Sequence, residues 1–171
     1  YVSHLNANWK VIADAFAETY HIPAIHPETI GSTFASKDNP FARPISTQTW
    51  GPHRSVSTYG NPAYAPPERA RVERLAYSNI ATGNVLSAAG LEGMDVFLKH
   101  PAINPTKSEH WAVDVTWLFP HFQMDVSPGG FWTHHFWPIT HNYTRWEARF
   151  HLPVAGDVWT RLQQEHYIAR L

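Results

Sequence analysis

The chain has 171 residues, of which 43% are hydrophobic, so it is long enough and apolar enough to form one domain with a core. It contains no cysteine, its formal net charge is −1, and it has no apolar run of eighteen residues. This composition excludes disulfides and thiolate metal sites within the chain, and it argues against nucleic-acid binding and against a membrane span.

The first predicted element is a short amphipathic helix over residues 8–21. Asn8 is a favourable N-cap. The apolar residues that follow it at helical spacing are Trp9, Ile12, Ala13, Phe16 and Tyr20. Pro23 cannot continue a helix interior, so the helix is expected to end just before it. Five residues of unbroken helix would rotate two side chains about 140° apart. A turn at the proline can instead bring His21 and His26 together.

His21 and His26 are the candidate metal ligands. Nitrogen ligands without thiolate suit iron, zinc, copper or nickel, and two histidines plus one carboxylate are typical of non-haem Fe(II) sites. Glu18 can bind the ring nitrogen that does not face the metal. Because most pairs of histidines bind no metal, two alternatives stay open. One is a metal-free module that binds a hydrophobic ligand. The other is a zinc hydrolase, although an HExxH-type helix is missing.

The middle of the chain has weaker patterns. Residues 27–45 are rich in proline and predict a loop. Strands are predicted over residues 46–50 and 54–59, on either side of a Gly-Pro turn. Residues 60–72 carry three prolines and then a charged helical patch. Residues 80–109 have no strong period, and we expect either a mobile region over a pocket mouth or an ordinary long surface connection.

The last third of the chain alternates apolar and polar residues, which predicts strands. These strands cover residues 111–119, 122–126, 131–137 and 142–152. Their short turns imply an antiparallel meander. A helix over 157–171 follows, and the combination predicts an α+β fold. His134 and His135 are adjacent on one strand, so they point to opposite faces and cannot chelate one ion as a pair.

The segment that contains the histidine pair resembles the iron-binding stretch of Rieske-type aromatic-ring-hydroxylating oxygenases, in the catalytic domain of their large (alpha) subunit. That family's pattern is Asn-Trp-Lys, an acid-Asn-Phe triplet, an acid, Tyr-His, four residues and His-Pro. The matching positions are Asn8, Trp9, Lys10, Asp14, Phe16, Glu18, Tyr20, His21, His26 and Pro27. Ala15 departs from the pattern, because the family commonly has Asn there, but this change does not touch the metal ligands.

The resemblance implies a fold and an activity. The fold is the helix-grip, START-like arrangement, in which an antiparallel sheet wraps a C-terminal helix and leaves an internal cavity. The activity is O₂ activation at a mononuclear non-haem Fe(II), which hydroxylates an aromatic or other apolar ring by mono- or dioxygenation, as in aromatic hydrocarbon catabolism. Glu18 is implied to bridge electron transfer from a neighbouring subunit. The alternative is a metal-free START-like module for hydrophobic ligands.

The third iron ligand implied by the resemblance is an Asp on the C-terminal helical region, expected beyond Leu171. Asp157 and Glu165 lie in the corresponding element, but neither aligns convincingly with that Asp. A helix-start role for Asp157, after Gly156, and a solvent-facing role for Glu165 are the simpler interpretations.

The resemblance also implies partners outside the chain. A Rieske 2Fe–2S cluster needs two Cys and two His, so it cannot form in a chain without cysteine. We therefore expect residues 1–171 to be a single catalytic domain, either a fragment of a longer subunit or a relative that obtains electrons elsewhere. The implied partners are a Rieske domain of the same or a neighbouring subunit, a ferredoxin and/or a reductase that uses NAD(P)H, and further subunits in a homotrimer or α3β3 assembly. We expect a cytoplasmic location.

Overall fold

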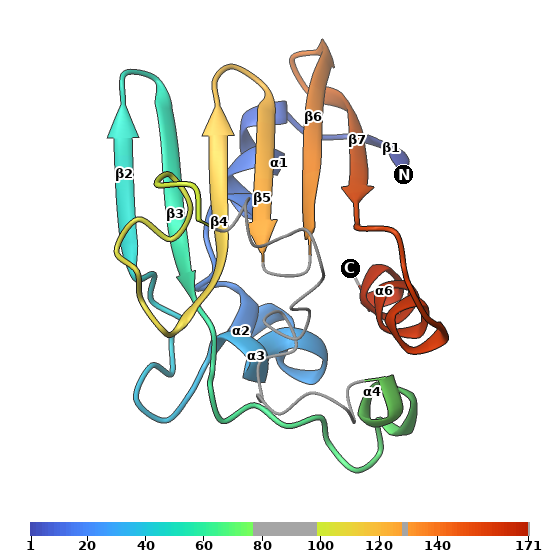
Figure 1. Cartoon of the computed structure of the whole chain (residues 1–171). Helices are drawn as coiled ribbons and strands as arrows, with labels where there is room; N and C mark the ends of the chain where they lie inside the picture. The colour runs from blue at the N-terminus through green and yellow to red at the C-terminus, as the bar shows by residue number, and fades with distance from the viewer. Residues whose placement is uncertain (77–98, 128–129, 171) are drawn as a thin grey trace.

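The computed structural model describes residues 1–76, 99–127 and 130–170. In this part of the chain seven strands form one antiparallel sheet, in the order β1-β7-β6-β5-β4-β3-β2 (Figure 1). The strands are β1 (Val2–Leu5), β2 (Ser46–Trp50), β3 (His53–Tyr59), β4 (Trp111–Leu118), β5 (Phe122–Ser127), β6 (Gly130–Thr140) and β7 (Tyr143–His151). The helical elements are α1 (Trp9–Phe16), α2 (Ile22–Ile25), the π-helical turn η1 (Pro27–Gly31), α3 (Ser32–Phe34), α4 (Arg71–Ala76) and α6 (Val158–Arg170).

The predicted strands are confirmed, with small shifts at their ends. β4, β5, β6 and β7 pair in chain order, which is the predicted meander, and β2 and β3 form a hairpin at the other side of the sheet. β6 continues to Thr140, three residues beyond its predicted end. β1 is a strand that the sequence did not predict. It pairs with β7 at the edge of the sheet, where Val2 lies opposite Glu147.

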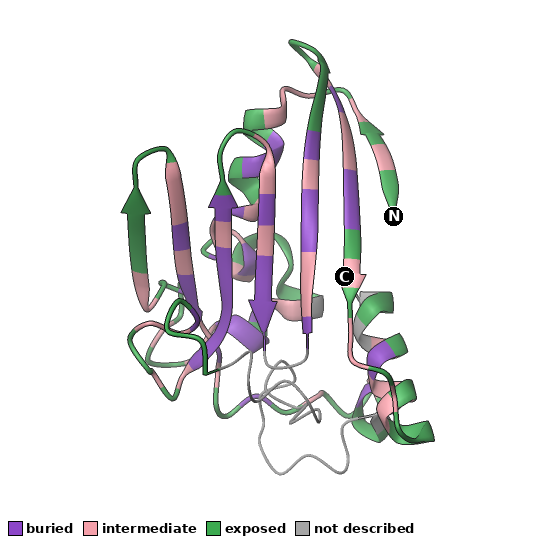
Figure 2. Cartoon of the chain, turned by 45° about the horizontal axis from the view of Figure 1, so that its top comes forward, coloured by how far each residue is buried: buried purple, intermediate pink, exposed green. Residues whose placement is uncertain are grey.

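The hydrophobic core lies between the sheet and the helices on one face, which we call the α1 face. Ile12 and Ala13 of α1 pack against Trp117 of β4 and Phe136 of β6, and Phe136 is fully buried. A second cluster packs Ile22 of α2 and the neighbouring Phe34 against β4. Burial is concentrated along the central strands (Figure 2). The core therefore fixes α1 and α2 on one side of the sheet.

The prediction of a single helix over residues 8–21 is wrong at its C-terminal end. α1 ends at Phe16, and the N–H of Ala17 turns back to the carbonyl of Asp14. Pro23 does not stop a helix but lies in the first turn of α2. A proline is tolerated at that position because the first turn of a helix has no intrahelical partner for its N–H groups. The break between the helices thus lies before the first histidine.

The other segments also differ from the sequence patterns in detail. Residues 27–45 were predicted as a loop, but they begin with η1 and α3 before they become irregular. The charged helical patch expected within 60–72 is α4, which starts only at Arg71. Residues 99–109 form turns without a helix or strand. The remainder of the expected mobile region, residues 80–98, lies outside the described residues.

α6 is the predicted C-terminal helix, so the α+β class with an antiparallel sheet and a terminal helix is confirmed. Asp157 caps its start, and Gln164 donates to the carbonyl of Pro153, which ties α6 to the segment that leaves β7. α6 lies beside α4 below the strands (Figure 1). The predicted internal cavity stays a prediction. No helix among the described residues is long and apolar enough to cross a membrane.

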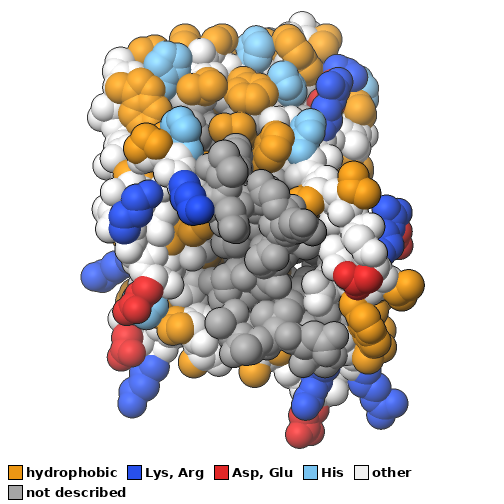
Figure 3. Space-filling model, in the orientation of Figure 1, with side chains coloured by type: hydrophobic (Ala, Val, Ile, Leu, Met, Phe, Trp, Pro, Cys, Tyr) orange, Lys and Arg blue, Asp and Glu red, His pale blue; other side chains and the backbone are white. Residues whose placement is uncertain are grey.

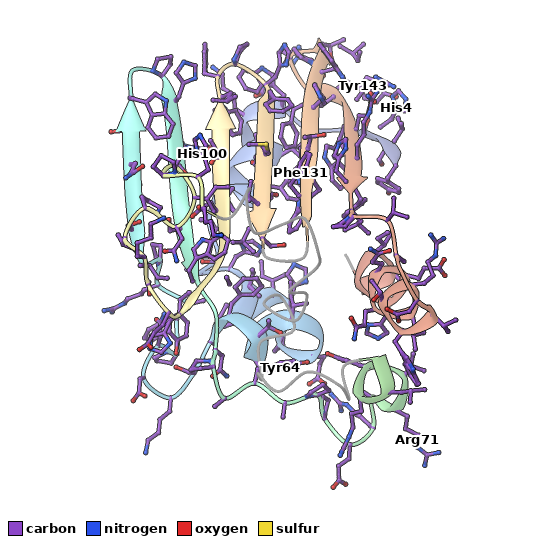
Figure 4. All side chains as sticks on the ribbon, viewed as in Figure 1. His4, Tyr64, Arg71, His100, Phe131 and Tyr143 are labelled. Carbon is purple, nitrogen blue, oxygen red and sulfur yellow. The ribbon has the colours of Figure 1, made fainter. Side chains whose placement is uncertain are left out.

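The opposite face of the sheet carries charged groups on β7. Glu147 lies between Arg145 and Arg149, and the Glu147 carboxylate accepts from Arg149 Nε at 2.8 Å. This hydrogen bond, together with the charges of both arginines, lowers the pKa of Glu147 below its usual 4.5. At the neighbouring edge, His4 of β1 and Tyr143 of β7 stack with ring centres 5.7 Å apart (Figure 4).

Histidine and aromatic side chains gather near the strand ends on this face. The ring of His135 stacks on Trp137 at 5.4 Å, and His121 contacts the same tryptophan at 4.7 Å. Burial lowers the pKa of His135 below its usual 6.5, although Glu147 opposes this change. Hydrophobic and histidine side chains are visible together at the top of the molecule (Figure 3).

Candidate metal centre

The candidate centre is built on the short connection from α1 to α2. The hydroxyl of Thr19 donates to the carbonyl of Ala42 at 2.9 Å, and Thr19 is buried. Ile22 is also buried in the core cluster beneath the sheet. These two anchors hold the backbone on either side of His21, so the position of His21 follows from packing at its neighbours.

Glu18 makes two contacts with His21. Its Oε1 lies 2.5 Å from His21 Nδ1, and its Oε2 accepts the backbone N–H of His21 at 3.1 Å. An ionised carboxylate can only accept hydrogen bonds, so Nδ1 carries the ring proton. In the neutral imidazole the other ring nitrogen, Nε2, then keeps its lone pair, which is the state that binds a metal. Both side chains are about three-quarters buried, with 24% and 22% exposed.

His26 is brought back to His21 by one turn of helix. His21 is the N-cap and His26 the C-cap of α2, and their ring centres are 5.6 Å apart at an interplanar angle of 75°. Two imidazoles that bind one metal ion through nitrogen–metal bonds of about 2.0–2.1 Å have ring centres within about 6 Å of each other. The observed separation therefore fits a shared ion, and the donor set fits iron or zinc.

The turn after His26 fixes its backbone. The carbonyl of His26 accepts the N–H groups of Ile30 and Gly31, which closes the π-helical turn η1. A side chain at Gly31 would place its Cβ 3.1 Å from that carbonyl oxygen, so a glycine allows this close approach. π-helical turns are rare and occur frequently at functional sites. The sequence gives no periodic pattern that predicts this one.

No third protein ligand lies beside the histidine pair among the described residues, where no group of three metal-binding side chains occurs. The Asp157 carboxylate accepts the N–H groups of Trp159 and Thr160 and the hydroxyl of Thr160. These bonds lower the pKa of Asp157 below its usual 3.8. Glu165 pairs with Arg161 at 2.6 Å. Both acids therefore have the helix-start and surface roles that were expected for them.

His134 and His135 point to opposite faces, as predicted. His134 is buried on the α1 face, where its Nε2 lies 3.0 Å from Asp125. This pair was missed in the sequence analysis, because His134 was considered there only together with its neighbour His135. The short turn between the predicted strands at 122–126 and 131–137 indicates a hairpin. A hairpin of that length places Asp125 and His134 on neighbouring strands, so this turn could have predicted the pair.

Similarity to known proteins identifies the family of the chain. The sequence model of one family, "Ring hydroxylating alpha subunit (catalytic domain)", matches residues 1–156. The chain belongs to this family. The resemblance seen in the segment from Asn8 to Pro27 is thereby confirmed, and it extends over most of the chain. A search of curated proteins found no match.

Two solved structures support the ring-hydroxylating fold. One is naphthalene 1,2-dioxygenase from Rhodococcus sp. bound to indole, with a TM-score of 0.61 and 17% identity. The other is the quaternary ammonium Rieske monooxygenase CntA in complex with an inhibitor, with a TM-score of 0.57 and 11% identity. Each alignment covers 100% of this chain, but only 38% and 34% of the respective solved chains. At these identities the likeness shows the fold of a ring-hydroxylating catalytic domain.

Proposed function

We propose that residues 1–171 are the mononuclear-iron catalytic domain of a Rieske-type oxygenase, with His21 and His26 as iron ligands. The observation that carries this proposal is the arrangement of Glu18, His21 and His26, in which one carboxylate orients one imidazole and a single helical turn presents the other. A metal-free module has no need for this arrangement. Membership in the ring-hydroxylating family supports iron as the metal.

Each of these residues has a distinct task in the proposed site. Nε2 of His21 and a ring nitrogen of His26 donate lone pairs to Fe(II), which supplies O₂ activation when bound. Glu18 holds the proton on Nδ1 of His21 and keeps the ring from rotating. The buried side chains of Ile22 and Phe34 exclude water from the protein side of the site. We propose that an Asp beyond Leu171 completes the ligand set.

The proposed substrate is an apolar ring, and the reaction is its hydroxylation. The substrate class is supported by the aromatic-rich composition, with eight Trp, nine Phe and seven Tyr, and by the family to which the chain belongs. One of the similar solved structures is a naphthalene 1,2-dioxygenase, so naphthalene is the probe of choice. Mono- and dioxygenation give a mono-alcohol and a cis-diol, which product analysis separates.

The electrons are proposed to come from outside this chain. A carboxylate has about four acceptor positions, and the two contacts with His21 leave Glu18 able to accept one more hydrogen bond. Its partial exposure allows a second protein surface to reach it. We propose that this surface is the Rieske domain of the same or a neighbouring subunit, in a trimeric or α3β3 assembly. A ferredoxin and/or an NAD(P)H-dependent reductase then supplies that domain.

Metal analysis of anaerobically purified protein tests the proposal. Iron at about one atom per chain is expected, and its loss in His21→Ala is expected as well. His141→Ala is the matched control, because His141 is an exposed histidine in the turn between β6 and β7. Zinc in place of iron would favour a hydrolase. A folded protein that takes up no metal would favour a hydrophobic-ligand module.

An isotope experiment tests the reaction itself. The iron-loaded protein is supplied with naphthalene, a separate Rieske domain, ferredoxin, reductase and NADH under ¹⁸O₂. Incorporation of ¹⁸O into a hydroxylated product is the expected result. Iron-loaded protein that receives electrons and still forms no labelled product with naphthalene or related apolar rings would contradict the proposed activity.

A further inference from the structure

A hydrogen-bonded chain of three residues is buried in the sheet on the α1 face. Asp125 on β5, His134 on β6 and Trp146 on β7 are its members. Asp125 Oδ2 lies 3.0 Å from His134 Nε2, and Trp146 Nε1 donates to His134 Nδ1 at 3.0 Å. Asp125 and His134 are each only 3% exposed. The chain crosses three adjacent strands, with Asp125 and His134 buried and Trp146 half-buried.

These contacts define the tautomer of His134, that is, which ring nitrogen carries the proton. An indole N–H can only donate, so His134 Nδ1 accepts and its Nε2 carries the proton that is donated to Asp125. Gln123, which is fully buried, donates its amide to both oxygens of Asp125. The ring of His134 is therefore held at both nitrogens and cannot turn without breaking a buried hydrogen bond.

The rings of this chain form a platform for the end of α1. His134 lies within 8° of parallel to both Phe136 and Trp146. Phe16 rests against all three rings, with centre-to-centre distances of 4.8 Å to His134, 5.0 Å to Trp146 and 5.8 Å to Phe136. Phe16 is the last residue of α1, and Glu18 follows two residues later. The platform thus determines where α1 stops.

A purely apolar core would avoid the free energy of desolvation that these polar groups cost. Burying a carboxylate and an imidazole requires removing both from water, and replacing such groups with packed hydrophobic residues is often neutral or stabilising. The hydrogen bonds from Asp125 and Trp146 instead fix the orientation of the His134 ring. The residue of α1 that touches this ring is Phe16. The arrangement therefore favours a role in placement over a role in stability.

We infer that His134, held between Asp125 and Trp146, is a positioning residue that fixes Phe16 and thereby sets Glu18 against His21. This inference rests on the proposed function, because it concerns the carboxylate that orients a proposed iron ligand. It assigns no contact with substrate or metal to His134. Its effect passes through the end of α1 to the two hydrogen bonds that Glu18 accepts.

Hydrogen exchange at the His21 backbone amide tests this inference without any metal, since that N–H donates to Glu18. Trp146→Phe keeps an aromatic ring but removes the N–H that donates to His134, together with part of the indole ring. We expect exchange at His21 to become about tenfold faster in this variant. The amide of Ile45, which donates to Ser57 in the part of the sheet far from β7, is the internal reference and is expected not to change.

His134→Ala and His135→Ala form the matched pair of variants. The two histidines are neighbours on β6 but lie on opposite faces, so only the first is expected to accelerate exchange at His21. If His134→Ala fails to fold, hydrogen exchange at His21 in Trp146→Phe tests the inference by itself. Unchanged exchange at His21 in a folded Trp146→Phe protein, or equal acceleration at His21 and Ile45, would overturn the inference.

Binding of Co²⁺, used as a spectroscopic probe, separates this inference from the proposed function. We expect Trp146→Phe to weaken Co²⁺ binding about tenfold, as is typical when the support of a histidine ligand is disturbed. If wild-type protein binds no Co²⁺ and exchange at His21 is still faster in the variant, the metal proposal is contradicted and the positioning role is supported. If wild-type and Trp146→Phe proteins bind Co²⁺ equally well, the positioning role is contradicted but the metal proposal is not.

Discussion

The carboxylate of Glu18 holds His21 at two points, with one oxygen on the ring and the other on the backbone N–H. The first contact sets the direction of the imidazole, and the second holds the backbone N–H of His21 just before α2. The ring and the backbone of His21 are therefore fixed by a single side chain.

Glu18→Gln is expected to weaken Fe²⁺ binding about 10- to 100-fold while the fold is retained, because Nδ1 of His21 loses its charged acceptor. Anaerobic titration calorimetry measures the change. Glu109→Gln is the control, since Glu109 is 89% exposed and distant in sequence from the site. Equal affinities in wild-type protein and Glu18→Gln would show that the carboxylate does not support the ligand.

Phe136→Ala is expected to destabilise the fold by about 3–5 kcal/mol, because it removes a fully buried ring from the core under α1. Urea unfolding followed by tryptophan fluorescence gives the free energy of unfolding. Phe41→Ala, at a residue that is 64% exposed, is expected to change it by less than about 0.5 kcal/mol. Similar effects of the two changes would contradict the assignment of the core.

Gly130→Ala is expected to cost more than about 2 kcal/mol. Gly130 has a φ of +145°, and a Cβ at this position would lie 2.7 Å from the carbonyl oxygen of His151 on the neighbouring strand. Gly156→Ala is the control, because a Cβ there meets nothing within 4 Å. A Gly130→Ala protein as stable as Gly156→Ala would mean that the β6–β7 pairing differs from the one described.

The stability of α6 is expected to depend on pH through Asp157. Hydrogen bonds from Thr160 and Trp159 lower the pKa of Asp157 in the folded chain. A lowered carboxyl pKa contributes stability that is present above the unfolded-state pKa, near 3.8, and is lost as the pH falls through the folded-state value. Circular dichroism should thus report loss of helix as the pH falls below about 4.

Asp157→Asn provides the control for this prediction. Asparagine is also a good N-cap but does not titrate, so the variant should keep α6 at neutral pH and lose less helix than the wild type on acidification. An identical loss of helix in both proteins would assign the acid sensitivity to other groups.

The strands could be predicted from sequence because apolar and polar residues alternate along them. β4 and β7 have this alternation in their sequences, and both were found, although β4 is buried on both faces. β1 was missed because a strand of four residues is too short for a pattern, and its pairing with β7 joins positions about 140 residues apart. Such a contact depends on the folded sheet, which a local pattern cannot represent.

The residues of the proposed site lie together, as their spacing predicted, but the backbone that carries them differs from the prediction. The spacing of Glu18, His21 and His26 identified the segment, yet α1 was expected to reach the first histidine. Its actual end at Phe16 lies against rings of β6 and β7, which are over a hundred residues away in sequence. Helix propensity contains no information about that contact. The buried Asp125–His134 pair was missed for the same reason, since each residue alone looks like an ordinary strand residue.

The most direct test of the account is the iron content of His26→Ala, measured beside the wild type after anaerobic reconstitution with Fe²⁺. The two imidazoles, with ring centres 5.6 Å apart, are proposed to share one ion. We therefore expect the variant to retain its fold but to lose both bound iron and turnover. A folded His26→Ala protein that still holds one iron per chain and remains active would contradict the assignment of the metal centre.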